Sequence, residues 1–500
     1  MTPLNLIEAP SGELIDDDPS RVPLANRVRA GVSWNASSAL ITELIRFGRS
    51  MILARLLVPE DFGLFGMALT VVAALNALSA LGLERTIIAT KFDSRAELET
   101  QLNTVWSVEL IRCLVIALLV SAAAWPMASF YGQPQLVVII PALAATTLIQ
   151  GFQNIGLAVL RKEISFARIF WYDLATNITG IALTIVLAFV MRNVWALVIG
   201  LLLTSALGAV FSYVFHPYRP RLAFERTALR RALNLGKYAL VISIASYAIT
   251  MADNIMVGKL LGTGALGNYS LAYNIASTPI SVLVFAFSSV LFPAYAEISA
   301  KRPENLEMAF VKVFSISLLT LLTISAALFL VGDEVVRLLF GDKWTDAGKV
   351  LPLLALVIPV RGLSLIVTTV FFAVNRHGQV AMARSAEALV FLAVIYPLVN
   401  AFGLAGAAWA GLIAYSFTLV NRLVGLRVII PGIGSRLLNI SLSTLVAAAA
   451  GLIVAEVALT FVSSPWARVL LGGLCSTTIP TASLLWFRPE LRKWLVEWFS

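Results

Sequence analysis

The chain has 500 residues, of which 59% are hydrophobic and only 13% are charged, and its mean hydropathy is +0.88. Soluble globular proteins have about 45–50% apolar and about 25% charged residues. The composition therefore excludes a soluble globular protein and indicates an all-α polytopic membrane protein. The formal net charge of +9 needs an explanation that fits this class.

The first thirty residues contain the polar, acidic stretch SGELIDDDPS (11–20). This stretch lacks the basic start and short apolar core of a cleavable signal peptide. We therefore expect residues 1–30 to form a disordered cytoplasmic tail.

Fourteen apolar stretches follow, each near the length of about 20 residues that a helix needs to cross a bilayer. The predicted spans are 32–57, 62–82, 102–124, 136–158, 170–191, 194–214, 236–258, 268–291, 311–331, 350–372, 385–401, 404–421, 437–460 and 467–487.

Counted through these spans, most of the 37 Lys and Arg residues fall in connections on one side of the membrane. The positive-inside rule makes that side cytoplasmic and places both termini there. One connection departs from the pattern, because we expect 332–350 to be a long outer loop with three basic residues and four acids. The net charge thus reflects topology and contact with anionic lipid, and we expect no nucleic-acid partner.

The densest basic stretch is HPYRPRLAFERTALRRALNLGKY (216–238). It is either a solvated cytoplasmic loop or the linker between two halves of the protein.

An internal repeat favours two halves. ARLLVPEDFGLFGMA (54–68) aligns with GKLLGTGALGNYSLA (258–272) at an offset of 204, which pairs Gly63 with Gly267. Both stretches follow the first span of a six-span block. We predict an N-lobe at 31–215, a basic cytoplasmic linker at 216–235 and a C-lobe at 236–425. Two further helices at 436–488 and a cytoplasmic tail at 489–500 complete the chain. Transporters built from such repeats bind substrate between the halves and work by alternating access.

Sequence motifs do not indicate an enzyme or a cofactor site. GTGALG (262–267) matches the GxGxxG dinucleotide fingerprint, but it joins two predicted membrane helices and not a strand and a helix. Cys113 and Cys475 lie far apart in apolar runs, and no metal-binding or nucleophile motif is present in the sequence. We therefore expect neither an enzyme nor a metal site.

Charges inside the first span are the main functional signal. On a helical wheel Arg46 and Arg49 share a polar face, with Glu43 at its edge. A charge at mid-membrane costs about 2.5–3.5 kcal/mol on insertion scales, so such a face must meet a bundle interior or an aqueous cavity. Because Glu43 is the one local partner of two cations, we predict that Arg46 and Arg49 bind an anionic group such as phosphate.

Other predicted spans carry charges too. At the offset of 204 Asp253 falls on Arg49, so Asp253 is either a counter-charge for these arginines or a Na⁺ or H⁺ coupling site. Glu109 and Arg112 lie one turn apart and are expected to pair, while Arg361 lies in the span 350–372.

Three stretches carry a family resemblance. LARLLVPEDFGLFGMA (53–68), LFPAYAEI (291–298) and LLFGDKWTDAGKVLPLLAL (338–356) resemble the Wzx-type (WzxC-like) polysaccharide flippases of the multidrug/oligosaccharidyl-lipid/polysaccharide exporter superfamily. The resemblance covers about 30 to 430.

The resemblance implies two six-helix lobes around a central cavity, with two extra helices at the C-terminal end. It implies a flippase that moves undecaprenyl-pyrophosphate-type lipid-linked oligosaccharide across a bacterial inner membrane for exopolysaccharide, capsule or O-antigen synthesis. Polysaccharide polymerase and export machinery are the implied partners, and no cofactor is implied. The family's cationic cavity residues correspond here to Arg46 and Arg49, with Arg112 and Arg361 as further candidates. The alternative is a cation-coupled antiporter for drugs or small metabolites from the same superfamily.

Overall fold

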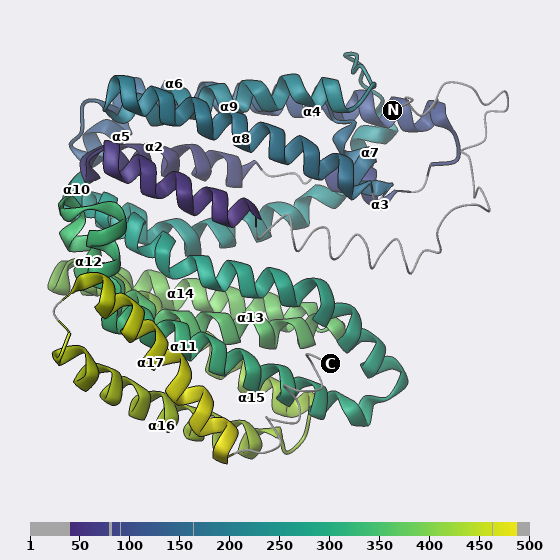
Figure 1. The fold of residues 1–500 in the computed structure, drawn as a ribbon. Coiled ribbons are helices and arrows are strands. Elements are labelled where there is room, and N and C mark those ends of the chain that lie inside the picture. The colour runs from purple at the N-terminus through teal and green to yellow at the C-terminus, as the bar shows by residue number, and fades with distance from the viewer. Residues whose placement is uncertain (1–40, 80–82, 91, 164, 463, 488–500) are drawn as a thin grey trace. The chain divides into compact units, whose positions relative to one another are not determined.

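The computed structural model describes residues 41–487 except 80–82, 91, 164 and 463 (Figure 1). Its regular structure over these residues is helical and includes no strand, which confirms the predicted fold class. Eight described helices are long and apolar enough to cross a membrane, or nine if one bent pair counts as a single span. The total of fourteen spans stays a prediction.

The described residues form two compact units. The first contains Val71–Leu187 and Trp195–Ile244. The second contains Ala188–Val194, the described residues up to Thr70, and those from Ala245 onward. The predicted lobe boundaries at 215 and 236 stay predictions.

The first unit is built from short and long helices in sequence order. They are the end of α2 (Pro59–Leu78), α3 (Leu83–Ala89), α4 (Arg95–Ala122), α5 (Ala124–Tyr131), α6 (Leu136–Gly151), α7 (Leu157–Lys162), α8 (Phe166–Met191) and α9 (Val194–Phe215). The single span predicted at 136–158 is wrong in its second part, because α6 ends at Gly151 and α7 begins at Leu157.

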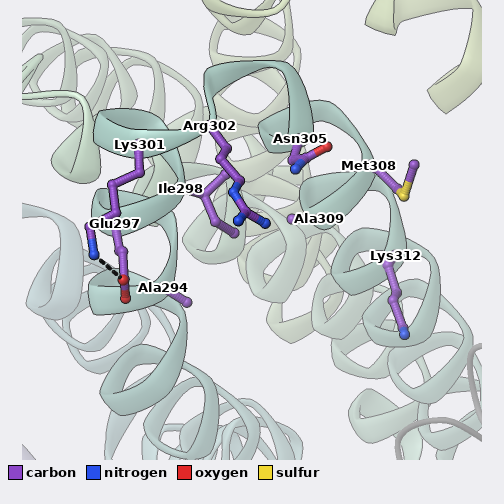
Figure 2. A pocket seen from close by; sticks show the side chains of 9 residues that line it. All are labelled: Ala294, Glu297, Ile298, Lys301, Arg302, Asn305, Met308, Ala309 and Lys312. Atoms are coloured by element: carbon purple, nitrogen blue, oxygen red, sulfur yellow. Dashed lines mark hydrogen bonds and ion pairs between the residues drawn. The ribbon is translucent and has the colours of Figure 1, made fainter.

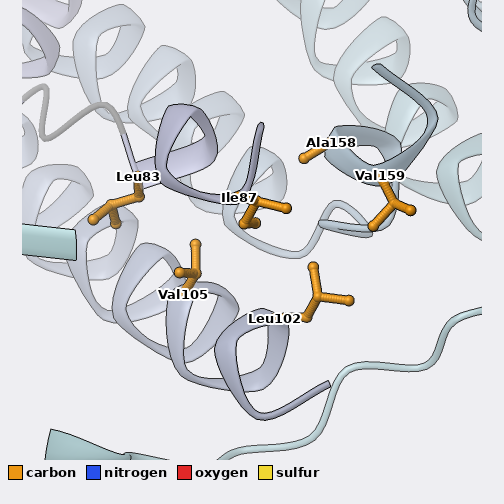
Figure 3. Packing of buried hydrophobic residues seen from close by; sticks show 6 residues of the cluster. All are labelled: Leu83, Ile87, Leu102, Val105, Ala158 and Val159. Carbon is orange, nitrogen blue, oxygen red and sulfur yellow. The ribbon is translucent and has the colours of Figure 1, made fainter. Parts of the chain in front are cut away.

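A small apolar core joins three of these helices (Figure 3). Leu83 and Ile87 of α3 pack with Leu102 and Val105 of α4 and with the start of α7. Ile87 and Val105 are fully buried. Each buried side chain of this kind contributes about 1.5–3 kcal/mol, so this core fixes the two short helices on α4.

The basic stretch after α9 is not a freely solvated loop. Residues 216–225 have no regular structure, and α10 begins at Arg226. The backbone N–H groups of Arg221, Ala223 and Glu225 donate to side-chain oxygens of Asn103, Ser107 and Thr104, at 2.8, 3.0 and 3.2 Å. Polar side chains of α4 thus satisfy backbone donors that a chain without helix or sheet partners must otherwise give to water.

The second unit begins with a helix over 41–56 and the start of α2. The other elements are the part of α10 (Arg226–Lys301) from Ala245 onward, η1 (Pro303–Asn305), α11 (Leu306–Phe340), η2 (Asp342–Trp344), α12 (Thr345–Ala355), α13 (Val357–Ala373), α14 (His377–Phe402), α15 (Leu404–Ile429), α16 (Ile433–Thr460) and α17 (Pro465–Phe487).

Two connections differ from expectation in this unit. The spans predicted at 236–258 and 268–291 both lie in α10, which is interrupted only at Gly262, where φ is 86°. A positive φ of this size suits glycine, which has no Cβ. The stretch 332–350 is mostly helical and not a long loop, because α11 runs to Phe340 and α12 starts at Thr345. The span predicted at 350–372 is split into α12 and α13, which meet at 45°.

The internal repeat produces a reciprocal contact between α2 and α10. A methyl group added at Gly63 would overlap the carbonyl oxygen of Thr263, and one added at Gly267 would overlap that of Pro59. At the offset of 204 Thr263 is the counterpart of Pro59. Each repeat therefore presents its glycine to the same point of the other, as in a two-fold contact. This confirms the predicted repeat at this place, where small residues let two helices approach closely.

Two of the stretches behind the family resemblance meet beside this contact. The indole N–H of Trp344 donates to the carbonyl of Ala54 at 2.8 Å, and the Trp344 ring packs edge-on against Phe62 at 5.1 Å. The guanidinium of Arg55 donates to the carbonyl of Leu339 at 2.8 Å. A cation at these carbonyls also complements the negative end of the α11 dipole. Arg55 thus anchors the end of α11.

Candidate substrate-binding charges

The helix over 41–56 carries two neighbouring arginines. Arg46 is 64% exposed and forms an ion pair with Glu43 at 3.1 Å. Arg49 is exposed and interacts with Arg46 as a like charge. It forms no hydrogen bond or ion pair with the part of the chain that the structure describes. The carboxylate of Glu43 thus pairs with Arg46 alone, which leaves the positive charge of Arg49 for an anionic ligand.

A second group of charges lies in the same unit around Asp253, on α10. The Asp253 carboxylate is buried and accepts the hydroxyl hydrogen of Tyr269 at 3.0 Å. Its other oxygen accepts the backbone N–H of Asn254 at 2.8 Å. The same carboxylate interacts electrostatically with Arg361. No hydrogen bond or ion pair joins it to Arg46 or Arg49 among the residues described here.

Arg361, on α13, is held among tyrosines. Its guanidinium donates to the hydroxyl of Tyr273 at 2.7 Å and lies 5.4 Å from the ring centre of Tyr415. Cation–π contacts are worth about 0.5–2 kcal/mol, more when water is excluded. The structure therefore brings together Asp253 and Arg361, two residues that the sequence selected separately.

A further arginine, Arg422, follows directly after the predicted span 404–421. It lies inside α15, is only 4% exposed, and donates to the hydroxyl of Ser364 at 2.6 Å and to its carbonyl at 3.0 Å. Glu387 is buried and pairs with Arg384 at 3.2 Å. These two groups extend the buried polar network of the second unit.

The two candidate charges in the first unit, Glu109 and Arg112, pair with each other, as expected. The Arg112 Nε donates to Glu109 at 2.9 Å, and its Nη1 donates to the hydroxyl of Ser79 at 3.0 Å. The predicted pairing of Glu109 with Arg112 is confirmed. Because Arg112 already has a carboxylate and a hydroxyl, it is less available to a ligand than Arg49.

The tyrosines of the second unit were not selected from the sequence. Tyr269 and Tyr273 lie near the start of a predicted span, where tyrosine is common at the membrane–water interface. Their spacing of four residues, which puts both rings on one face of a helix, is the signal that was available. The sequence contains no pattern that joins Tyr415 to them.

Many apolar helices with buried and exposed charges define a multi-pass membrane protein of the transporter class. A family model described as "Polysaccharide biosynthesis protein" matches residues 52–349. The chain belongs to this family. The predicted assignment to the Wzx-type branch of the exporter superfamily is thereby confirmed, and with it a transport protein and not an enzyme.

Individual relatives agree with this assignment. The lipopolysaccharide biosynthesis protein WzxC of Escherichia coli (strain K12) is 28% identical over 67% of this chain and 67% of its own. The succinoglycan biosynthesis transport protein ExoT of Rhizobium meliloti (strain 1021) is 26% identical over 77% of this chain and 80% of its own. A solved structure of the lipid II flippase MurJ in an inward closed conformation matches 91% of this chain and 98% of its own, with 16% identity and a TM-score of 0.73. This last likeness shows the fold.

Proposed function

We propose that this protein is a flippase that moves a polyprenyl-pyrophosphate-linked oligosaccharide from the cytoplasmic to the outer leaflet of a bacterial inner membrane. The family match supports the proposal. The names of the similar proteins, which describe lipopolysaccharide biosynthesis, succinoglycan transport and lipid II flipping, also support it. The observation that carries the substrate class is the positive charge at Arg46 and Arg49, of which only Arg46 is paired with a carboxylate among the described residues.

A pyrophosphate headgroup fits this charge. Guanidinium groups bind phosphate oxygens through paired, charge-assisted hydrogen bonds. Arg49 is the first candidate because no described residue pairs with it, and Arg46 is the second because it already pairs with Glu43 at 3.1 Å. Arg361 and Arg112 remain candidates that must first give up a tyrosine or a carboxylate partner.

Asp253 supports transport in one of two ways. Its contact with Tyr269 and its interaction with Arg361 favour a counter-charge that holds Arg361 when no substrate is bound. Coupling to Na⁺ or H⁺ at the same carboxylate is the alternative. A counter-charge would also help release, since an anion must be bound weakly enough to leave.

The cycle is alternating access between two repeats, with both termini in the cytoplasm. The headgroup crosses through the protein while the prenyl chain stays in lipid. Polysaccharide polymerase and export proteins would take up the product on the outer side.

The test measures the sidedness of the lipid-linked oligosaccharide in spheroplasts that carry or lack the protein. Depletion should trap the oligosaccharide on the cytoplasmic leaflet. Wild type should restore export, Arg49→Ala should fail, and Arg49→Lys should restore part of it because charge is retained without paired hydrogen bonds. Arg95→Gln, a change of the same charge at an exposed site (66%), is the matched control. Unchanged sidedness on depletion would favour the small-molecule antiporter.

A further inference from the structure

Beyond its break at Gly262, α10 carries an uncharged polar face. Its side chains recur at the spacing of three and four residues that defines one side of a helix, and they are Ser270, Asn274, Ser277, Thr278 and Ser281. Asn274 and Ser281 are exposed, and the other three are half-buried. The opposite side of the helix is apolar and buried, and it includes Leu271, Ile275 and Ile280. The packing of this unit thus covers the apolar side and leaves the polar face open.

This face does not suit lipid. The exposed side of α16, in the same unit, includes the apolar residues Leu438, Leu442 and Val446, as expected of a helix that contacts acyl chains. Along 262–281 no large apolar side chain is exposed, although this stretch falls largely within the predicted span 268–291. Polar side chains in a membrane helix face the protein interior or a water-filled cavity. The exposed polar face of α10 therefore fits an aqueous cavity.

The polar groups of this face are free to bind hydroxyl groups. Thr278 donates its hydroxyl hydrogen to the carbonyl of Asn274 at 2.8 Å, and Ser281 donates to the carbonyl of Ser277 at 3.2 Å. A hydroxyl that donates in this way still has its lone pairs, so it can accept a hydrogen bond from a ligand. The Asn274 amide provides two donors and an acceptor, and it forms no side-chain hydrogen bond within the part of the chain that the structure describes. Sugar hydroxyl groups, which both donate and accept, match this set.

The face also lacks the charges that a phosphate group requires. The stretch 260–296 contains no acidic residue, lysine, arginine or histidine. Charged residues resume at the end of α10, where Figure 2 shows Glu297 bonded to Lys301 at 2.8 Å beside a pocket. Arg361, which donates to Tyr273 next to Asn274, interacts with the carboxylate of Asp253. The strong hydrogen bonds of a phosphate need cationic donors, so a neutral, hydroxyl-rich group suits this face better.

We infer that the uncharged face of α10 binds the sugar part of the transported lipid-linked oligosaccharide through hydrogen bonds to sugar hydroxyl groups. The inference rests on the proposed function, which gives the diphosphate end of the same molecule to Arg46 and Arg49. A few well-placed hydroxyl and amide groups are what fixes the orientation of a ligand in a site. A site that hydrogen-bonds a ligand hydroxyl also discriminates against a ligand without it. Asn274 and Thr278 are therefore specificity-determining residues for the sugar.

The test compares the binding of two lipids to the purified full-length protein by native mass spectrometry. One is the lipid-linked oligosaccharide extracted from cells depleted of the protein, and the other is undecaprenyl diphosphate without sugar. Asn274→Leu should weaken binding of the glycosylated lipid by about tenfold and Thr278→Val by about fivefold, because hydrogen bonds to the sugar are lost. Binding of the sugar-free lipid should not change in either variant.

A matched control is available on α11. Thr320 is exposed, and its hydroxyl donates to the carbonyl of Ile316 at 2.9 Å, as that of Thr278 does to Asn274. Thr320→Val should bind both lipids like wild type. Thr278→Val preserves the shape of the side chain, so it decides the question even if Asn274→Leu proves unstable in thermal melting.

The results separate this inference from the proposed function. Unchanged binding of the glycosylated lipid in Thr278→Val and in folded Asn274→Leu overturns the sugar site. Equal weakening of both lipids, or an equal effect of Thr320→Val, overturns it as well. Arg49→Ala should weaken both lipids, because both carry the diphosphate. If Arg49→Ala weakens neither lipid while Thr278→Val weakens only the glycosylated one, the diphosphate assignment is wrong and the sugar site stands.

Discussion

The contact between Gly63 and Thr263 makes a sharp prediction about helix packing. A methyl group at Gly63 would overlap the Thr263 carbonyl oxygen and lie 2.8 Å from its Cα. Carbon atoms pack best at about 3.5–4.0 Å, so the two helices would have to separate by about 1 Å. Overpacking of this kind costs about 1–3 kcal/mol. Gly63→Ala should therefore lower the apparent melting temperature of the purified protein in detergent.

The same helix offers a matched control. A methyl group at Gly66 would lie 3.5 Å from the Leu266 side chain, an ordinary contact. Both variants gain about 1 kcal/mol of helix propensity from alanine, so the difference between them isolates the overlap. Gly267→Ala should behave like Gly63→Ala. The double variant should be less damaging than the sum, because one separation of the helices relieves both overlaps. Equal melting temperatures for Gly63→Ala and Gly66→Ala would refute this account of the contact.

Three further predictions concern single side chains. Burial, together with two nearby arginines, lowers the pKa of His216 to about 4. Its pKa in the unfolded chain is about 6.5, so stability should be full above that pH and fall as the pH drops toward 4. Solvent screening limits the loss of stability to about 1 kcal/mol. Between pH 8 and pH 5 the melting temperature should fall less in His216→Asn than in wild type, and an equal fall in both proteins would contradict this. Trp344→Phe should cost about 1–3 kcal/mol because it leaves the buried carbonyl of Ala54 without its donor; thermal melting checks it, and Trp466→Phe, at an exposed tryptophan, should be nearly silent. Tyr273→Phe should lower thermal stability by about 1.5–3 kcal/mol through the lost hydrogen bond to a charged group, and a variant as stable as wild type would show that Arg361 does not depend on the hydroxyl.

The lengths of the apolar stretches predicted the positions of the helices better than the connections between them. The predicted spans 170–191 and 194–214 nearly coincide with α8 and α9, since apolar length alone decides them. The connections between helices were harder to predict, because the local backbone geometry determines them. A single positive φ at Gly262 replaces an expected connection, and a 45° bend divides one predicted span.

The candidate charges were predictable, but their partners were not. A charge in an apolar span is conspicuous in any sequence, so Asp253 and Arg361 were both selected. Their association depends on α10 and α13 meeting in space, and the Tyr415 ring comes from a third helix. The spacing of three residues that pairs Glu109 with Arg112 acts within one helix, and there the sequence was sufficient to predict the pair.

The arginines of this protein differ in whether other residues of the chain already provide partners for their charge. Arg422 is buried and bonded to Ser364, the half-buried Arg112 pairs with Glu109, and the exposed Arg55 donates to the carbonyls that end α11. Removing any of these should first reduce stability, because a partner loses its hydrogen bond to a charged group. Arg49 has no such partner among the described residues, so its removal leaves no group unsatisfied there. Loss of transport without loss of stability is therefore the result that distinguishes a ligand-binding arginine from a structural one, and Arg49 is where we expect it.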